Sequence, residues 1–114
     1  MPYINIKTNK NVSVEEEALL RQKFGEAISI FPGKSENWLM FLLEDGCKMA
    51  FKGKTESSMA FVEIKLYGEV NPAASRKMTG RACEILKDVL GISPDQVYVR
   101  YEATENWGWN GDNF

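Results

Sequence analysis

Histidine is absent from the chain, and cysteine occurs only at Cys47 and Cys83. Without histidine there is no His-based catalytic triad, no histidine metal ligand and no histidine general base. The two cysteines lack CxxC spacing, so we interpret them as small buried hydrophobic residues rather than as a disulfide framework or a metal site. Any catalysis must use amines, carboxylates, tyrosines, hydroxyls or backbone groups, and we expect no metal and no cofactor.

Long apolar runs and an excess of basic charge are also missing. The longest nearly uncharged apolar run, 38–43, is far too short to span a membrane, and the first residues lack the basic and apolar regions of a signal peptide. The net charge is −2 without a basic stripe, which argues against nucleic acid as a partner. We therefore expect a cytoplasmic protein with no membrane partner, and secretion by another route stays open.

Pro2 follows Met1 directly, at the head of a segment, 3–8, with strand-forming residues in partial alternation. Two interpretations stay open. Proline is tolerated as the first residue of a strand, because it has no N–H to give to the ladder. If Met1 is removed, however, the chain begins with a free secondary amine, a group that no other position in a protein offers.

Two helices are predicted by their caps and apolar stripes. Ser13 and Glu16 have the spacing of a capping box, and the acidic run 15–17 suits a helix start rather than a metal site. Pro32-Gly33 ends this first helix. The second helix runs from the cap Asn71 to Gly91. The expected buried stripes are Leu20, Phe24, Ala27, Ile28 and Phe31 in the first helix, and Met78, Ala82, Ile85, Leu86 and Val89 in the second.

Further strands are expected around these helices. The apolar segment 37–45 predicts a buried strand, and Asp45-Gly46 predicts a hairpin turn into a short edge strand at 47–53. Segment 59–68 alternates and segment 97–103 is the last full strand.

The element order is strand, helix, strand, repeated once, within a single domain over 1–114. We expect an α+β fold, βαββαβ, with a four-stranded mixed sheet and both helices on one face. The other face, with Phe61, Tyr98 and neighbours such as Trp38, is expected to be too apolar for solvent, which favours oligomerisation.

The sequence resembles the macrophage migration inhibitory factor family of the tautomerase superfamily. The matching pieces span nearly the whole chain in the family's order: Pro2 behind Met1, Thr8-Asn9, Gly33-Lys34, Gly68, ISPDQVYV at 92–99 and NWGWNG at 106–111. The resemblance implies a homotrimer with active sites shared between adjacent subunits. It also implies that the mature N-terminal proline acts as general base and acid in keto–enol tautomerisation of phenylpyruvate-like or dopachrome-like substrates.

That chemistry needs an amine with a pKa near the working pH, and an apolar pocket and a nearby cation would both lower the pKa. Lys34 matches the family's lysine and would also bind the substrate carboxylate. Tyr98 matches the tyrosine that reaches in from the neighbouring subunit, although a simple interface role stays open. With Pro2 and Lys34 as catalytic residues, the expected substrate-binding residues are Tyr3, Trp38, Lys65, Leu66, Tyr67, Tyr98, Arg100, Trp107, Trp109 and Phe114. The tail aromatics suit either a pocket wall or a subunit clamp.

Several positions depart from the family. The family's human members carry CxxC where this chain has 59–62, so a thiol-redox activity is not carried over. Leu66-Tyr67 is bulkier than the usual pair and should narrow the pocket. Arg100 replaces an asparagine, as a second carboxylate anchor or an interface ion pair, and Trp107 replaces a valine. The substrate is therefore open. The alternatives are a cytokine-like signalling protein that binds a receptor if it is secreted, and a related enzyme that hydrates or decarboxylates its substrate.

Overall fold

The computed structural model describes all 114 residues. Its first half consists of β1 (Pro2–Thr8), α1 (Val14–Ala27) and β2 (Met40–Glu44), and its second half of β3 (Ala60–Tyr67), α2 (Pro72–Leu90) and β4 (Val97–Thr104). The remaining elements are the 3₁₀ turns η1 (Ile28–Ile30), η2 (Glu36–Trp38) and η3 (Pro94–Gln96), and the short strands β5 (Gly108–Trp109) and β6 (Asp112–Asn113). The expected βαβ repeat is thereby confirmed.

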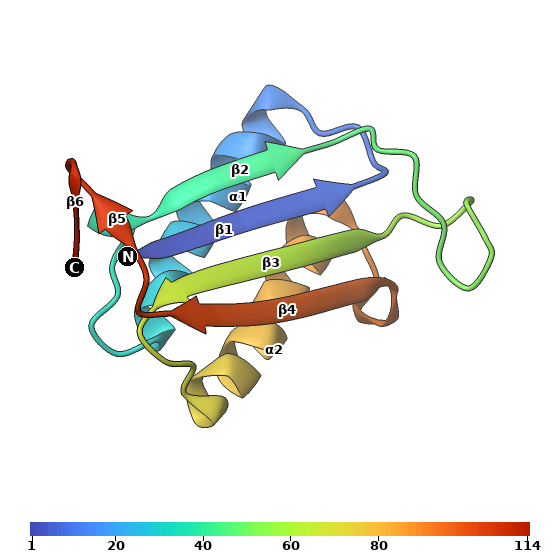
Figure 1. Ribbon diagram of the computed structural model, residues 1–114. Helices are drawn as coiled ribbons and strands as arrows, with labels where there is room; N and C mark the ends of the chain where they lie inside the picture. The colour runs from blue at the N-terminus through green and yellow to red at the C-terminus, as the bar shows by residue number, and fades with distance from the viewer.

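The four long strands form one mixed sheet in the order β2-β1-β3-β4. β1 is parallel to β2, β3 is parallel to β4, and the two halves meet through the antiparallel pair of β1 and β3. Both helices cover the same face of this sheet, as Figure 1 shows, and the other face carries no helix. This arrangement confirms the predicted α+β fold class.

The core lies between the sheet and the helices. β3 shows how the sequence builds it: alternate residues are buried, and Val62, Ile64 and Leu66 have no solvent exposure. Period-2 alternation in a strand places these side chains on one face, where they meet the apolar stripes of α1 and α2. No helix in the structure is long and apolar enough to cross a membrane.

Both helices begin at their predicted caps, and α2 ends at Gly91 as predicted, whereas α1 ends at Ala27, before Pro32-Gly33, and passes into the 3₁₀ turn η1. The Ser13 side chain accepts a hydrogen bond from the Glu16 N–H at 3.1 Å, and the Glu16 carboxylate accepts from the Ser13 N–H at 3.0 Å, which completes the capping box. Asn71 caps α2 by accepting from the Ala74 N–H at 3.0 Å. Gly91 ends α2 with a φ of 69°, a conformation that favours glycine.

Loss of the Ser13 cap gives a stability prediction. Ser13→Ala should lower the free energy of unfolding by about 1 kcal/mol, because the Glu16 N–H in the first turn loses its side-chain acceptor. Urea midpoints at one fixed protein concentration measure the change. Ser93→Ala is the matched control, since Ser93 precedes η3 without a side-chain cap hydrogen bond. Equal midpoints for Ser13→Ala and the wild type would contradict the prediction.

A strand forms within 37–45 as predicted, but its predicted burial is wrong, and so is the hairpin into a second strand at 47–53. β2 is an edge strand that pairs only with β1, and it leaves Met40 68% and Leu42 43% exposed. Because β2 is parallel to β1, the chain must then cross the end of β1 to reach β3. Asp45 does not turn a hairpin; its carboxylate accepts from the Val12 N–H at 2.9 Å. Segment 47–53 forms no strand, and its only bridge joins Phe51 to Lys54.

The open face of the sheet is less apolar than expected. Its middle carries charged pairs, with Lys7 and Glu63 at 3.3 Å and Arg100 and Glu102 at 3.0 Å. Trp38 is not part of the sheet, because it belongs to η2, before β2 begins. Apart from Leu42 on the edge strand β2, the apolar side chains gather at the two ends of the sheet, and the two ends have different chemistry.

Candidate functional site

A cleft of about 660 Å³ lies at the end of the sheet where β1 begins. The topology brings distant segments together there, because β1 starts beside the ends of β3 and β4, and η2 leads into β2 at the same edge. Figure 1 shows the N-terminus beside β5. The cleft is lined by Met1, Pro2, Tyr3, Asn37, Trp38, Leu39, Met40, Lys65, Trp107, Gly108 and Trp109.

The N-terminal amine of Met1 lies beside Lys34. Burial of the amine lowers its pKa from the ordinary value, and the positive charge of Lys34 and a hydrogen bond with that side chain lower it further. The Lys34 ammonium also donates to the Tyr67 carbonyl oxygen at 2.8 Å, and the Tyr67 N–H donates to the Met1 carbonyl oxygen at 3.1 Å. The backbone of Tyr67 therefore holds Lys34 next to the Met1–Pro2 peptide bond.

Pro2 is buried and pairs with Leu66 at the start of the β1–β3 ladder. It therefore serves as the first residue of a strand, as one interpretation of the sequence expects. Its nitrogen forms an amide with Met1 in this structure, so it has no basic lone pair here. Removal of Met1 would convert this nitrogen into a secondary amine at the wall of the cleft, close to Lys34.

A row of aromatic side chains leads from Tyr67 and Phe114 to Trp109 and Trp38, and the last two of these line the cleft. Tyr67 contacts Phe114 with ring centroids 5.1 Å apart, and Phe114 stacks on Trp109 at 6.4 Å. Trp109 then meets Trp38 edge-on at 5.1 Å. The Phe114 N–H donates to the Trp107 carbonyl oxygen at 3.0 Å, which closes the tail on itself. The tail thus lines a cleft of its own chain, as the pocket-wall interpretation predicts.

The charge in this cleft is of one sign. Lys65 and the N-terminal amine line it, and no aspartate or glutamate does. The Lys65 ammonium lies 5.9 Å from the centre of the Tyr3 ring. An apolar cleft with aromatic walls and only positive charges suits a flat, anionic small molecule.

Three predicted residues lie elsewhere. Leu66 is a correction: it is fully buried in the core, because its position in β3 faces the helices, and it cannot contact a substrate. Arg100 points from the middle of the open face and pairs with Glu102. Tyr98 is the second residue of β4 and lies five residues before Ala103, which is in register with Leu66 and so with Pro2. Five residues of strand span about 17 Å, too far for Tyr98 to reach the cleft of its own chain.

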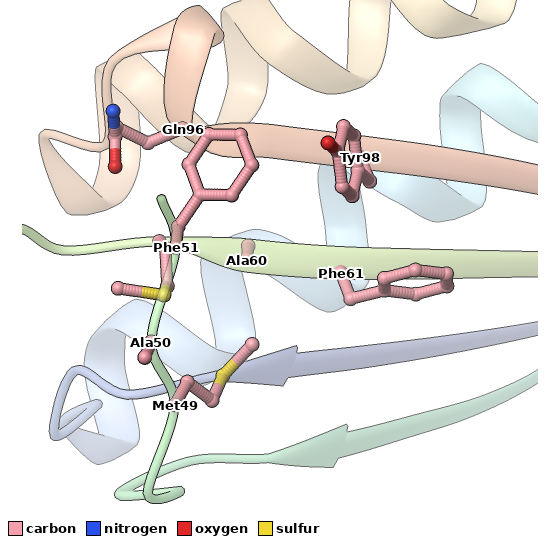
Figure 2. Close-up of a pocket in the computed structure, with 8 residues that line it drawn as sticks. Met49, Ala50, Phe51, Ala60, Phe61, Gln96 and Tyr98 are labelled. Atoms are coloured by element: carbon pink, nitrogen blue, oxygen red, sulfur yellow. The ribbon is translucent and has the colours of Figure 1, made fainter. Parts of the chain in front are cut away.

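Tyr98 instead belongs to a second, apolar hollow of about 260 Å³ at the opposite end of the sheet. Figure 2 shows Met49 and Phe51 of the loop after β2 beside Phe61 of β3 and Tyr98 of β4. The rings of Phe51 and Tyr98 meet edge-on with centroids 5.1 Å apart. This hollow has an almost entirely apolar lining and no charged side chain.

Several residues that line the cleft were not predicted from the sequence, namely Met1, Asn37, Leu39, Met40 and Gly108. Met40 faces Tyr3 in the parallel register of β1 and β2. The signal was the expected βαβ order itself, because such a unit pairs its two strands in parallel and so places Met40 beside Tyr3.

The chain is similar to known proteins over its whole length. The family model described as macrophage migration inhibitory factor (MIF) matches residues 1–114. The macrophage migration inhibitory factor of Rattus norvegicus is 32% identical over 100% of this chain and 99% of that protein. The crystal structure of Leishmania major MIF2 matches with a TM-score of 0.92 and 29% identity over 100% of this chain and 97% of that one. The structure of Pt0534 inactivated by 2-oxo-3-pentynoate matches in fold, with a TM-score of 0.86 and 16% identity over 97% of this chain and 94% of that one.

Proposed function

The chain belongs to the macrophage migration inhibitory factor family, and from this membership we propose that it is a cofactor-independent isomerase. It catalyses keto–enol tautomerisation of a small 2-oxo acid, phenylpyruvate-like or dopachrome-like. The observation that carries the proposal is the N-terminal amine, whose pKa is lowered by burial and by Lys34 at the edge of an aromatic, positively charged cleft.

The reaction needs one base that also returns the proton. With Met1 removed, the neutral nitrogen of Pro2 takes a proton from the carbon beside the substrate's ketone, and the C–H electron pair forms the enolate. The resulting pyrrolidinium gives its proton to the enolate oxygen, which yields the enol and restores the amine. The reverse sequence converts the enol to the ketone.

The residues around the amine would stabilise the negative charge of the enolate. Lys34 supplies a cation that binds the carboxylate or the developing oxyanion. Removal of Met1 also takes away the acceptor of the Tyr67 N–H, since that group donates to the Met1 carbonyl oxygen. The freed N–H becomes a backbone donor beside the amine, well placed for a substrate oxygen.

We also propose that the active unit is a homotrimer. β2 and β4 both leave an edge of the sheet unpaired, and the apolar hollow at Tyr98 lies at the opposite end from the cleft. If neighbouring copies pack sheet edge to sheet edge, the free edges of β2 and β4 become paired and the hollow at Tyr98 is covered. In such an assembly Tyr98 of one subunit reaches the cleft of the next, which no single chain can achieve.

The experiment compares two forms of the protein that differ only before Pro2. One form begins at Pro2, and the other keeps a single residue ahead of it, with both termini verified by intact-mass spectrometry. The enol-to-keto conversion of phenylpyruvate is followed by absorbance. We expect the blocked form to be slower by at least about 10²-fold, because its Pro2 nitrogen is an amide.

Two outcomes would contradict the proposal. One is equal rates in both forms, and the other is a methionine-free form no faster than buffer. Sedimentation velocity on the same samples checks the assembly, since a single 12.9 kDa chain in solution would contradict the shared site.

A second candidate function is cytokine-like signalling with little enzymatic activity. The whole-length similarity to the rat protein, whose name denotes inhibition of macrophage migration, favours it. This function requires secretion and a receptor, whereas the sequence predicts a cytoplasmic location by default. Receptor binding that survives Pro2→Gly would separate it from the isomerase.

A further inference from the structure

We propose that Lys65 binds a second anionic group of the substrate, so that the cleft favours 2-oxo acids that carry another negative charge on their apolar part. The inference rests on the proposed function for the reaction itself. The position of Lys65 makes it a specificity-determining residue rather than part of the base machinery, because its ammonium lies over Tyr3 and not beside the N-terminal amine.

The first argument is that Lys65 has no carboxylate partner within the chain. The other two cations of the open face are paired, Lys7 with Glu63 at 3.3 Å and Arg100 with Glu102 at 3.0 Å. Glu102 lies directly opposite Lys65 in the β3–β4 register, yet it is bonded to Arg100. The Lys65 side chain lies instead over Tyr3, on the β1 side, where it lines the cleft.

The second argument is the environment of this ammonium. Lys65 is half-buried, and the other lining residues of the cleft include three tryptophans but no acidic residue. A partly desolvated cation without a counter-ion is an attractive position for an anionic ligand group, since the bond would be a charge-assisted one.

The third argument is the spacing of the two points on β3 that mark the lysines, Tyr67 for the bound ammonium of Lys34 and Lys65 itself. Lys34 is bonded to the carbonyl oxygen of Tyr67, and Lys65 precedes Tyr67 by two residues on the same face. Two residues of strand separate the Cα atoms of Lys65 and Tyr67 by about 7 Å. A ligand with one carboxylate at Lys34 and its apolar part against the aromatic wall would bring a second anion to Lys65.

The test uses two matched pairs of compounds. Phenylpyruvate and 4-carboxyphenylpyruvate are substrates that differ by one carboxylate. The unreactive pair 3-phenylpropionate and 3-(4-carboxyphenyl)propionate measures binding alone. Trp38, Trp107 and Trp109 are the chain's three tryptophans and all line the cleft, so quenching of intrinsic fluorescence reports on this site.

In the methionine-free protein, Lys65→Met should weaken binding of the dianionic ligand and lower kcat/KM for the dianionic substrate by about tenfold each. The kinetic loss should appear mainly in KM, and the monoanionic partners should change by less than about twofold. Lys65→Arg should retain the preference for the dianion. Lys77→Met is the control, because it removes the same charge from an exposed position of α2, on the helical side of the sheet.

The role of Lys65 would be overturned if Lys65→Met lowered binding and kcat/KM equally for both members of a pair. It would also be overturned if the dianion showed no selective loss. A protein with no turnover but with selective loss of dianion binding in Lys65→Met would overturn the isomerase proposal and support the anion site. The binding and kinetic measurements thereby separate the two proposals.

Discussion

Replacing Pro2 with glycine in the methionine-free protein is expected to lower kcat for phenylpyruvate tautomerisation by about 10²-fold or more. Glycine keeps an amine, but that amine is primary, less basic and free to rotate. The pyrrolidine ring of Pro2 fixes the nitrogen at the start of β1, where Pro2 is buried against the sheet. The measurement is the steady-state rate from absorbance, with the mass of the intact chain confirmed for each preparation.

Pro94→Gly is the matched control for this prediction. Pro94 is exposed at the start of η3 and lines neither the cleft nor the hollow at Tyr98, so the same substitution there should leave kcat within about twofold of the wild type. A wild-type rate in Pro2→Gly would exclude the N-terminal nitrogen as the base.

The second large effect is expected from Lys34→Met, which should lower kcat/KM by about 10²–10³-fold, because the site loses the cation that binds the carboxylate and stabilises the enolate. The substitution should also change the pH dependence. The Lys34 charge lowers the pKa of the N-terminal amine, and we expect the same for the Pro2 amine after Met1 is removed. Without that charge the pKa rises, so more of the amine is protonated and inactive at a given pH.

The acid limb of the profile of kcat/KM against pH should therefore move to higher pH in Lys34→Met. Lys34→Arg keeps the charge and should leave the limb close to its wild-type position while restoring part of the rate. An unmoved limb in Lys34→Met would mean that burial alone lowers the pKa. Burial is the largest of the causes in the structure, so the direction of this shift is a strict test of the contribution of Lys34.

Local signals in the sequence predicted most of the elements. The capping box at Ser13, the cap at Asn71 and the terminal glycine of α2 depend on residues within one helical turn, so the sequence contains all the partners. The alternation of β3 also gave the correct buried face. That alternation places Leu66 with Val62 and Ile64, and it already argued against a substrate contact for Leu66.

Contacts between residues far apart in the chain determined the course of the segment after β2, which local signals in the sequence could not predict. Asp45-Gly46 is a common hairpin turn, but here β2 pairs in parallel with β1, and the segment after it crosses to β3. The contacts that override the turn, from Val12 and Lys10, come from 33 and 36 residues earlier in the chain. No window of sequence contains both partners, so the pattern favoured the hairpin.

The amino-acid sequence by itself determined the two βαβ halves, the family membership that its motifs indicate, and the candidates Pro2, Lys34 and the aromatic tail, because these depend on local periodicity and on residue type. Only the tertiary structure decided which candidates meet. It joined Lys34 to the N-terminal peptide through Tyr67, buried Leu66, separated Tyr98 from the cleft by the length of the sheet, and left Lys65 without a carboxylate. The physical reason is that these relations follow from strand order and register, which set distances between residues far apart in the chain.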